Sequence, residues 1–523
     1  MQIWQQRWFQ WAILILLCLW LAALYMQRIN FTASDLGRHL MNGQVILQSG
    51  SVFSTNFYSF TNSEFSVPNH HWLFGVLAFL VYQMGGFELL SLTGMALSMA
   101  GVLIMVFGVR AFQRQLLLPL SGGLFLLLPI LAHRAEVRPE AVSLVIFSGL
   151  TILTWRWLRS KTQPSFPWKF TLIWVLTMFF WVNTHIFFIF GGVILGAAGF
   201  QLLAERDWVR LRQLVGIGLA AASICLLNPV GLQGILFPLQ IFNNYAYRVA
   251  ENQSIWFFLQ YHPRPYYVYL TLAVLVFNFL AAVPLLRRKK STKHLFPNLL
   301  VLIFSLLTAF ITRYESIFAL VALFWIGSGG WQQIKNWLAL ARQKIPETIR
   351  LSLGSVIGGA VLISWLTTAN IAPIGMQYGL GLLPANRQSA AFFKSLEIEG
   401  NLFNNYDIGG FLIFDLYPET RVFVDNRPEA YPGDFMINEY IAAQTDEVVW
   451  EAMVQRYDLG AIYFYRHDMT NWGQAFMIRR IRDEAWEPIY VDDYVLILVK
   501  DTPAHQEIIE QYQLPAETFA LPG

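Results

Sequence analysis

The sequence predicts a polytopic α-helical membrane protein with about eleven transmembrane helices and a soluble α/β domain at its carboxyl end. Its 523 residues are 56% hydrophobic and only 13% charged, with a mean hydropathy of +0.46. A soluble domain carries about 25% charged residues. Apolar stretches approaching the roughly 20 residues that cross a bilayer recur as far as residue 369. From residue 370 the charge density rises and the long apolar stretches end.

The apolar stretch from Trp8 to Met26 is predicted to be an uncleaved first helix. It is longer than the apolar region of a typical signal peptide, and no clear small-residue cleavage site follows it. The other spans are placed by the same criterion of apolar length. The predicted spans are roughly 9–26, 87–109, 115–132, 140–157, 169–183, 187–204, 213–228, 265–286, 295–311, 316–330 and 351–369.

Basic residues alternate between the connections of these spans. Cytoplasmic connections of membrane proteins are enriched in Lys and Arg. With the amino terminus in the cytoplasm, all five cytoplasmic connections are basic, so we expect the carboxyl-terminal domain outside. The basic residues are Arg110 and Arg114; Arg156, Arg159, Lys161 and Lys169; Arg206, Arg210 and Arg212; Arg287, Arg288, Lys289, Lys290 and Lys293; and Lys335, Arg342, Lys344 and Arg350.

Several functional classes are disfavoured by composition and motif content. The net charge of +3 is too small to indicate a nucleic-acid partner. The two cysteines, Cys18 and Cys225, lie in apolar stretches and provide neither a disulfide framework nor a Cys-based zinc site. The sequence has no Gly-rich phosphate loop, HExxH motif or Gly-x-Ser-x-Gly motif, which disfavours ATP-driven machines and the common zinc-protease and serine-hydrolase classes.

The outward connections hold most of the ionisable residues that are candidates for a site. They are 27–86, 133–139, 184–186, 229–264 and 312–315, followed by the tail from residue 370. Ionisable groups at membrane depth are costly and usually functional. The candidate site residues are Asp35, His39, His70, His71, Arg134, Glu136, Arg138, Asn183, His185, Arg313 and Glu315.

The first outward loop, 27–86, contains two predicted helices. Ser34 is a natural cap for an amphipathic helix that places Asp35 and His39 on one face. An aspartate near the cap beside a solvated histidine is the simpler alternative. The stretch 69–83 is predicted to be an interfacial helix that ends at Gly85-Gly86. The adjacent residues His70 and His71 point in different directions on a helix, which disfavours both binding one metal ion.

Charged and polar residues recur in three further outward turns. Arg134-Ala135-Glu136-Val137-Arg138-Pro139-Glu140 joins two spans, and Pro139 suits the first turn of the second. Its arginines are suited to binding phosphate or carboxylate, or Glu136 and Glu140 neutralise them in a structural network. His185, in Trp181-Val182-Asn183-Thr184-His185, is either a site residue or a buried histidine bonded to a carbonyl. Arg313-Tyr314-Glu315 again places an arginine beside a carboxylate, and Asn228-Pro229 predicts a turn.

Ordered short motifs along most of the chain resemble the GT-C class of membrane glycosyltransferases, in particular little-studied bacterial members that depend on polyprenyl-phosphate sugars. The motifs are Asp35-x-x-x-His39-Leu40 with Gly43 and Ile46-Leu47, Phe60-Thr61, His71-Trp72-Leu73, Arg138-Pro139, Trp181-x-Asn183-x-His185, Asn228-Pro229-x-Gly231, Tyr406-Asp407-x-Gly409-Gly410-Phe411-Leu412 and Val424-Asp425-x-Arg427.

The resemblance implies a GT-C-like transmembrane domain over 1–369 and an extracytoplasmic domain over 370–523. Asp35 would be the catalytic carboxylate of the first loop, acting as a general base or as a ligand of a divalent metal, Mg or Mn. Many relatives carry paired acids in this loop. Ala33 stands where the first would be, which leaves metal dependence open. The arginines would stabilise a phosphate leaving group, and His39 and His71 would position it or donate a proton.

The implied function is transfer of a sugar from a polyprenyl-phosphate-linked lipid donor to an extracytoplasmic glycan, lipid or protein acceptor. The implied location is the bacterial plasma membrane, in contact with membrane lipids and with no nucleic acid. The alternative is a non-catalytic polytopic protein, either a glycan transporter or a scaffold that has lost catalysis. Charged residues gathered on one face favour the enzyme, because transporters place ionisable groups at mid-membrane. The single carboxylate favours the alternative.

The carboxyl-terminal region is predicted to form a small α/β domain with helices at 434–456 and 471–484. Asp492-Asp493 joins its last two strands in a predicted hairpin. The charged turn Asp425-Asn426-Arg427-Pro428-Glu429 is predicted to be salt-bridged locally, and the functional alternative is that this domain helps to bind the acceptor. The predicted strands are Asn401 to Tyr406, Phe411 to Phe414, Arg421 to Asp425, Gly460 to Tyr465, Glu487 to Val491 and Tyr494 to Lys500.

Overall fold

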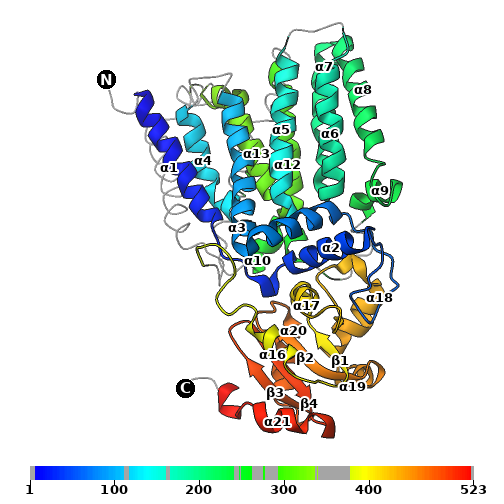
Figure 1. Cartoon of the computed structure of the whole chain (residues 1–523). Coiled ribbons are helices and arrows are strands. Elements are labelled where there is room, and N and C mark those ends of the chain that lie inside the picture. Colours follow the sequence, from blue (N-terminus) through cyan, green and yellow to red (C-terminus); the bar gives the residue numbers. More distant parts are fainter. Residues whose placement is uncertain are drawn as a thin grey trace. The chain divides into compact units, whose positions relative to one another are not determined.

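The computed structural model divides the chain into two compact units, each built from separate stretches of sequence (Figure 1). Unit 1 comprises Met1–Gln27, Ser91–Gly231 and Arg248–Leu380, and unit 2 comprises Arg28–Leu90, Leu232–Tyr247 and Gly381–Gly523. The described residues are 6–110, 117–160, 165–240, 247, 249–261, 272, 275–276, 292–335, 339 and 377–519.

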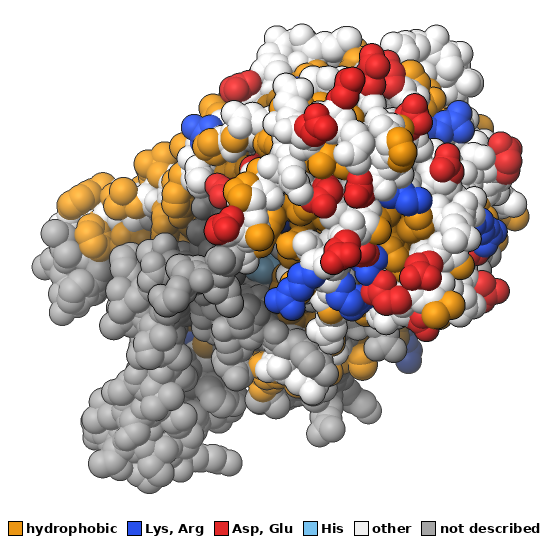
Figure 2. All heavy atoms as spheres, turned by 90° about the horizontal axis from the view of Figure 1, so that it is seen from below, with side chains coloured by type: hydrophobic (Ala, Val, Ile, Leu, Met, Phe, Trp, Pro, Cys, Tyr) orange, Lys and Arg blue, Asp and Glu red, His pale blue; other side chains and the backbone are white. Residues whose placement is uncertain are grey.

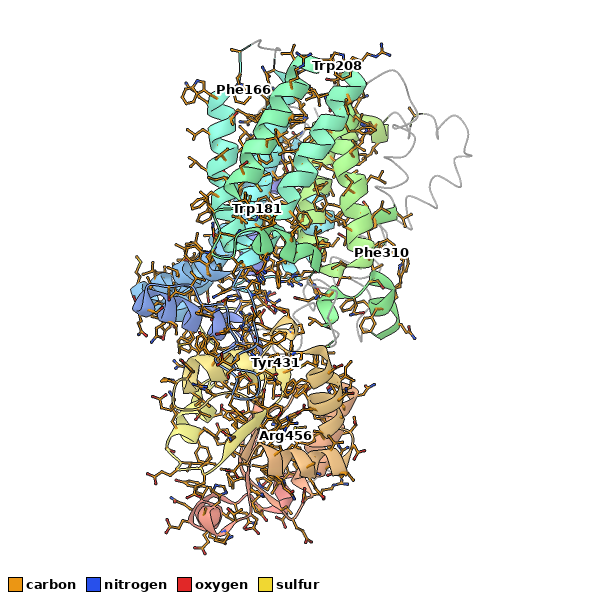
Figure 3. The ribbon with its side chains drawn as sticks, turned by 90° about the vertical axis from the view of Figure 1, so that its right-hand side faces the viewer. Phe166, Trp181, Trp208, Phe310, Tyr431 and Arg456 are labelled. Atoms are coloured by element: carbon orange, nitrogen blue, oxygen red, sulfur yellow. The ribbon has the colours of Figure 1, made fainter. Side chains whose placement is uncertain are left out.

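Unit 1 is a helical bundle whose helices follow the apolar stretches. In Figure 1, α5, α6, α7, α8 and α12 stand side by side within it. Figure 3 places Phe166 and Trp208 near one end of this bundle and Trp181 toward the other. The helices are α1 (Arg7–Tyr25), the part of α3 (Trp72–Arg110) from Ser91, α4 (Leu117–Ala132), α5 (Pro139–Arg159), α6 (Trp168–Thr184), α7 (Ile189–Glu205), α8 (Trp208–Ile224), α10 (Ile255–Tyr261), α12 (Leu295–Phe310) and α13 (Glu315–Trp325).

Among the described residues, six helices are long and apolar enough to cross a membrane, and α4 is a shorter apolar helix. The chain is therefore a polytopic helical membrane protein, as predicted. The spans 265–286 and 351–369 fall largely or wholly outside the described residues, so the total of eleven stays a prediction. The span predicted at 213–228 lies several residues too late: α8 begins at Trp208 because Asp207 caps it, accepting a hydrogen bond from the Arg210 backbone N–H at 3.0 Å.

Unit 2 begins with two helices that pack backbone to backbone. These are α2 (Leu36–Ser49) and the part of α3 that precedes the break at Gly85-Gly86, where Gly86 has a φ of 62° that favours glycine. A Cβ on Gly43 would lie 2.2 Å from the carbonyl oxygen of Gly75, so only glycine permits this approach. The predicted end of the 69–83 helix at these glycines is confirmed. A short helix, α9 (Leu232–Gln240), also belongs to this unit.

The carboxyl-terminal part of unit 2 is built on a four-stranded sheet of order β1-β2-β4-β3. β1 and β2 are parallel, whereas β2–β4 and β3–β4 are antiparallel. All seven residues of β2 are buried, as expected for an interior strand covered on both faces. The elements are α16 (Gln388–Lys394), β1 (Asn401–Asn404), α17 (Gly409–Leu416), α18 (Gly433–Phe435), α19 (Glu447–Arg456), β2 (Leu459–Tyr465), α20 (Asn471–Ile481), β3 (Trp486–Val491), β4 (Val495–Lys500) and α21 (Gln506–Tyr512).

This sheet domain is acidic on its surface, as suits a soluble domain. Between residues 377 and 519, Asp and Glu outnumber Lys and Arg by 23 to 10. Figure 2 shows acidic side chains spread among fewer basic ones on the face of the domain in view. Anionic lipid surfaces attract basic segments of proteins. An acidic domain therefore gains no electrostatic attraction to such a surface.

Two predicted strands are wrong, and one predicted helix is divided. Phe411–Phe414 lies in helix α17, because a short apolar run does not distinguish a strand from a buried helix. Arg421–Asp425 contributes only an isolated bridge between Val422 and Ser59. The helix predicted at 434–456 is interrupted before α19, where Asp446 caps a new helix start. The predicted hairpin is confirmed: Asp492 Oδ1 accepts hydrogen bonds from the backbone N–H groups of Tyr494 and Val495, both at 2.8 Å.

Candidate functional site

Three arginines of unit 1 gather around two glutamates, and we call this group the arginine cluster: Arg134, Arg138, Arg313, Glu140 and Glu251. Arg134 and Arg138 lie in the turn between α4 and α5, where Pro139 occupies the first turn of α5 as predicted. Arg313 lies in the short 3-10 helix Thr312–Tyr314. Glu251 lies in another, Ala250–Asn252. Three chain segments, 134–140, 250–252 and 312–314, therefore supply the five side chains.

The two carboxylates are shared among the three guanidinium groups. Glu251 Oε2 accepts hydrogen bonds from Arg134 Nη2 and Arg138 Nη1, both at 2.8 Å, and Glu251 Oε1 lies 3.3 Å from Arg313 Nη1. Glu140 Oε1 accepts from Arg313 Nη2 at 2.8 Å and from Arg134 Nη2 at 3.3 Å. Burial by itself would raise the pKa of Glu251, but Arg134 and then Arg313 hold it well below its usual range.

The second oxygen of Glu140 faces a histidine. Glu140 Oε2 lies 3.9 Å from His185 Nε2 and, among the described residues, has no hydrogen-bond partner. His185 Nδ1 lies 2.7 Å from Ser143 Oγ, and Trp181 Nε1 donates to the same hydroxyl at 2.8 Å. Because the indole only donates, Ser143 can give its own proton to Nδ1, which leaves an N–H at Nε2 directed toward Glu140. The partner at Nδ1 is a hydroxyl rather than the expected carbonyl.

A small cavity opens among the side chains of the arginine cluster. Its free volume is about 10 Å³, room for about one water molecule. Charged groups line one part of the cavity and apolar or small residues the remainder. The lining residues are Ser98, Arg134, Glu136, Arg138, Glu140, Ala141, Leu144, Phe187, Arg313, Ser316 and Ile317.

Three other predicted site residues of unit 1 have partners at the edge of this cluster or beyond it. Glu136 forms an ion pair with Arg138. Glu315 lies 2.5 Å from His133 Nδ1, so its close contact is a histidine. The Asn183 amide donates to the carbonyls of Phe179 at 2.8 Å and Leu227 at 3.3 Å, which ties α6 to the turn after α8.

In unit 2, Asp35 directly precedes α2 and occupies the cap position that Ser34 was expected to fill. Ser34 instead donates to the carbonyl of Phe31 at 3.4 Å, and no side-chain bond caps the helix. The start of α2 packs on the start of α17: a Cβ on Gly37 would lie 2.4 Å from the carbonyl oxygen of Gly410. Asp35 is therefore held beside the Tyr406-Asp407 segment that precedes α17.

Asp407 is an ionisable residue of unit 2 to which the sequence assigned no role. Burial raises the pKa of Asp407 to about 7, and the negative charges of Asp468 and Asp35 add to this shift. Asp468 is held firmly, because Asn405 donates to its Oδ2 at 2.9 Å and the Thr470 hydroxyl donates to its Oδ1 at 2.7 Å. Asp407 thus places a second carboxyl group in the electrostatic environment of Asp35.

The three predicted histidines of the first loop form one aromatic group. The ring centroids of His39 and His71 are 5.4 Å apart, and those of His70 and His71 are 4.0 Å apart. His70 also lies 4.8 Å from Phe237 of α9, and His39 is 1% exposed. In the described part of the chain, no group of three or more His, Cys, Asp or Glu residues is arranged to hold a metal ion.

The predicted salt bridge in the Asp425–Arg427 turn is present and buried. Arg427 Nε donates to Asp425 Oδ1 at 2.8 Å, and Arg427 Nη2 donates to Asp425 Oδ2 at 2.6 Å. Arg427 Nη2 also donates to Asn56 Oδ1 at 2.6 Å, and the Tyr431 hydroxyl lies 3.2 Å from Asp425 Oδ2. Asn56 belongs to the loop that precedes α3, so this turn attaches that loop to the sheet domain within unit 2.

The structure adds five residues to the predicted set: Glu140, Glu251, Ser143, His133 and Asp407. Glu251 had a signal in the sequence, because it is the only acidic residue of the outward connection 229–264 while the neighbouring turns carry three arginines. A buried arginine requires a counter-charge. Ser143 and His133 had no comparable signal, since each is one polar residue within or beside an apolar stretch.

Comparison with known proteins identifies the fold. No protein-family model and no curated protein matches the sequence. ArnT from Cupriavidus metallidurans in the apo state is 11% identical with a TM-score of 0.55, covering 97% of this chain and 98% of that one. ArnT bound to undecaprenyl phosphate is 11% identical with a TM-score of 0.51, covering 94% and 97%.

A third solved structure has the same fold. The oligosaccharyltransferase AglB from Archaeoglobus fulgidus, in complex with an inhibitory peptide and a dolichol-phosphate, is 10% identical with a TM-score of 0.56. The alignment covers 93% of this chain and 73% of AglB. The GT-C membrane fold predicted from the motifs is confirmed, together with a soluble carboxyl-terminal domain.

Proposed function

We propose that this integral membrane protein transfers a sugar from a polyprenyl-phosphate-linked donor to an extracytoplasmic acceptor. The observation that carries the proposal is the arginine cluster, in which three mostly buried guanidinium groups converge at the ends of membrane helices. Arginine binds phosphate through paired hydrogen bonds. The shared fold with ArnT, which has been solved with undecaprenyl phosphate, supports the same ligand class for this chain.

The arginine cluster would bind the phosphate of the donor. When the bond between the anomeric carbon and the phosphate oxygen breaks, negative charge develops on that oxygen. Arg134, Arg138 and Arg313 would stabilise this charge in surroundings that exclude water. Glu136 and Glu140 would position the guanidinium groups, and His185 would face Glu140. Glu315 would hold His133, and Asn183 would hold the end of α6.

Asp35 would accept the proton of the acceptor. The acceptor oxygen forms its bond to the anomeric carbon, its proton passes to the Asp35 carboxylate, and polyprenyl phosphate leaves. His39 of α2, and His70 and His71 before α3, would orient the acceptor or the phosphate. A divalent metal, Mg²⁺ or Mn²⁺, is the cofactor that the fold implies. Since the described residues offer no three-ligand group for one, the proton transfer is assigned to Asp35 alone.

The proposed setting is a bacterial plasma membrane with the amino terminus in the cytoplasm and the sheet domain outside. The alternation of basic connections in the sequence supports this orientation. The acceptor belongs to the classes of glycan, lipid or protein outside the cytoplasm. A non-catalytic transporter or scaffold stays the second candidate, because Ala33 leaves Asp35 as the only acid in its part of the loop.

The proposed function is tested with purified protein in liposomes, labelled polyprenyl-linked sugars and candidate acceptors. We expect transfer by the unmodified protein and a loss of about 100-fold or more in Asp35→Asn, because a positioned general base contributes at least this factor. Asp434→Asn, which alters an exposed aspartate, is the matched control. Full transfer by Asp35→Asn at equal expression contradicts the assignment, and parallel assays with EDTA test the metal.

A further inference from the structure

Glu251 occupies the position that an anionic ligand of the arginine cluster would take. One of its oxygens accepts hydrogen bonds from two arginines, and the other faces the third at 3.3 Å. A phosphate uses its oxygens in the same way, since paired N–H groups of arginine fit phosphate and carboxylate alike. The side chain of Glu251 is therefore an internal equivalent of a bound phosphate.

Glu251 reaches the cluster from a different segment than the arginines it contacts. Its short 3-10 helix, Ala250–Asn252, is connected to Thr312, whose backbone N–H donates to the Gln253 carbonyl at 3.0 Å. The Thr312 hydroxyl donates to the Glu251 carbonyl at 3.2 Å. These bonds fix the backbone, while the carboxylate is held only by the arginines in the contacts that the structure gives. Rotation about the bonds of the Glu251 side chain would therefore release the carboxylate while these backbone bonds stay in place.

Unlike Glu251, Glu140 is positioned to remain bonded to the arginines when a phosphate binds. It lies in the first turn of α5, where the positive end of the helix dipole favours a carboxylate. Its Oε1 accepts two hydrogen bonds from Arg313, from Nε at 3.1 Å and from Nη2 at 2.8 Å. Of the two central carboxylates, Glu251 is the one that can leave while the arginine geometry is kept.

The free volume beside the arginines is small, and Glu251 is not among the residues that line it. The cavity holds about one water molecule, which is too little for a phosphate group. A phosphate that binds the converging N–H groups would take the place of the group that now accepts from them, the Glu251 carboxylate. An exchange of anions also avoids an intermediate in which the three arginines keep only Glu136 and Glu140 as counter-charges, which would be unfavourable.

We propose that Glu251 is an internal ligand of the arginine cluster and that the phosphate of the polyprenyl lipid displaces it on binding. The inference rests on the proposed function and adds a competing occupant of the same site. The apparent affinity for phosphate is then reduced by the fraction of protein in which Glu251 occupies the arginines. Removing the charge of Glu251 removes this competition and strengthens phosphate binding.

The test measures binding of undecaprenyl phosphate by the full-length protein in nanodiscs, with inorganic phosphate as a separate probe. We expect Glu251→Gln to bind undecaprenyl phosphate at least about tenfold more tightly than the unmodified protein. In the unmodified protein, the state in which Glu251 has left the arginines and phosphate can bind would be a minor one, populated at about 10% or less. The control is Glu447→Gln, which removes a glutamate that joins Arg479 and Arg480 in unit 2. Its affinity for the lipid should change by less than about twofold.

The two probes separate the possible sources of the phosphate. A gain with undecaprenyl phosphate, with or without a gain for inorganic phosphate, supports the exchange at a lipid site. A gain for inorganic phosphate alone, or equal or weaker binding of both, overturns it. If neither protein binds either probe, the arginine cluster is not a phosphate site and the proposed function loses its supporting observation as well.

A second variant keeps the test decisive if Glu251→Gln is unstable. Thr312→Val removes the hydroxyl bond to the Glu251 carbonyl and leaves every charge of the cluster in place. Thr312→Val should also bind undecaprenyl phosphate more tightly than the unmodified protein, but its gain in affinity should be smaller than that of Glu251→Gln. Weaker binding by Thr312→Val at unchanged thermal stability contradicts the exchange.

Discussion

Two groups of buried arginines and carboxylates, one in each unit, use the same chemistry in different ways. In unit 2, Arg427 and Asp425 are two residues apart, and the Asp425 carboxylate is fully bonded by Arg427 and Tyr431 at 0% exposure. In unit 1, the arginine cluster draws on three segments, and Glu140 Oε2 has no hydrogen-bond partner among the described residues. A local ion pair whose polar atoms are all hydrogen-bonded supports a fold. A group of ion pairs that is shared among segments and leaves one polar atom without a hydrogen bond is able to exchange partners.

The difference follows from where each chain segment is anchored. Asp425 and Arg427 share one turn, so neither can leave without unfolding that turn, and Asn56 attaches it to the first loop. Glu251 lies in a different segment from its three arginines, and its backbone is bonded to Thr312, beside Arg313, so its carboxylate is the part that we propose to exchange. Stability should therefore depend most on the pair in unit 2, and ligand affinity on the cluster in unit 1.

The largest expected effect is on the stability of unit 2. Arg427→Met leaves the Asp425 carboxylate buried without its counter-charge, which costs about 3–5 kcal/mol. We expect hydrogen-exchange protection in β1 and β2 of the full-length protein to fall by this amount.

The matched control is Arg456→Met at the end of α19 (Figure 3). Arg456 pairs with Glu439 at 3.0 Å but is 64% exposed, so its loss should cost less than about 1 kcal/mol. Equal losses of protection in the two variants contradict a structural role that is specific to Arg427.

The next effect is on phosphate binding. Arg313→Lys keeps the positive charge but loses the planar guanidinium, which contacts Glu140 Oε1 and Glu251 Oε1 at the same time. We expect affinity for undecaprenyl phosphate to fall by about tenfold. Arg427→Lys, the same substitution in unit 2, should leave the affinity within about twofold while lowering protection in β2. A larger loss of affinity from Arg427→Lys would mean that the two groups do not divide the roles as proposed.

The smallest expected effect is the pH dependence introduced by Asp407. Its folded pKa of about 7 lies above its ordinary value of 3.8, so the folded state prefers the protonated form. The resulting stabilisation is complete below about pH 4 and is lost as the pH rises through 7. Asp407→Asn, which stays neutral, should raise the melting temperature at pH 8 by several degrees and have little effect at pH 4. A pH-independent difference contradicts the raised pKa.

The helices were predictable from the sequence because a bilayer demands long apolar stretches. The apolar run Phe411–Phe414 was not, since its length fits a strand or a buried helix equally and only its packing against α2 decides. Within the site, the sequence identified the three arginines because charge is rare in such a chain. It did not show that Glu251, more than 100 residues from Arg134, is their common partner, because contacts between distant segments leave no local pattern.

Phosphorus-to-nitrogen couplings from solid-state NMR test the central claim most directly. Undecaprenyl phosphate would be bound to full-length protein with ¹⁵N-labelled arginine in lipid bilayers. We predict dipolar contacts between the phosphorus and guanidinium nitrogens that weaken in Arg313→Lys and persist in Arg427→Lys. Bound lipid with no arginine contact, or with a contact that Arg313→Lys leaves unchanged, would contradict a phosphate that takes the place of Glu251.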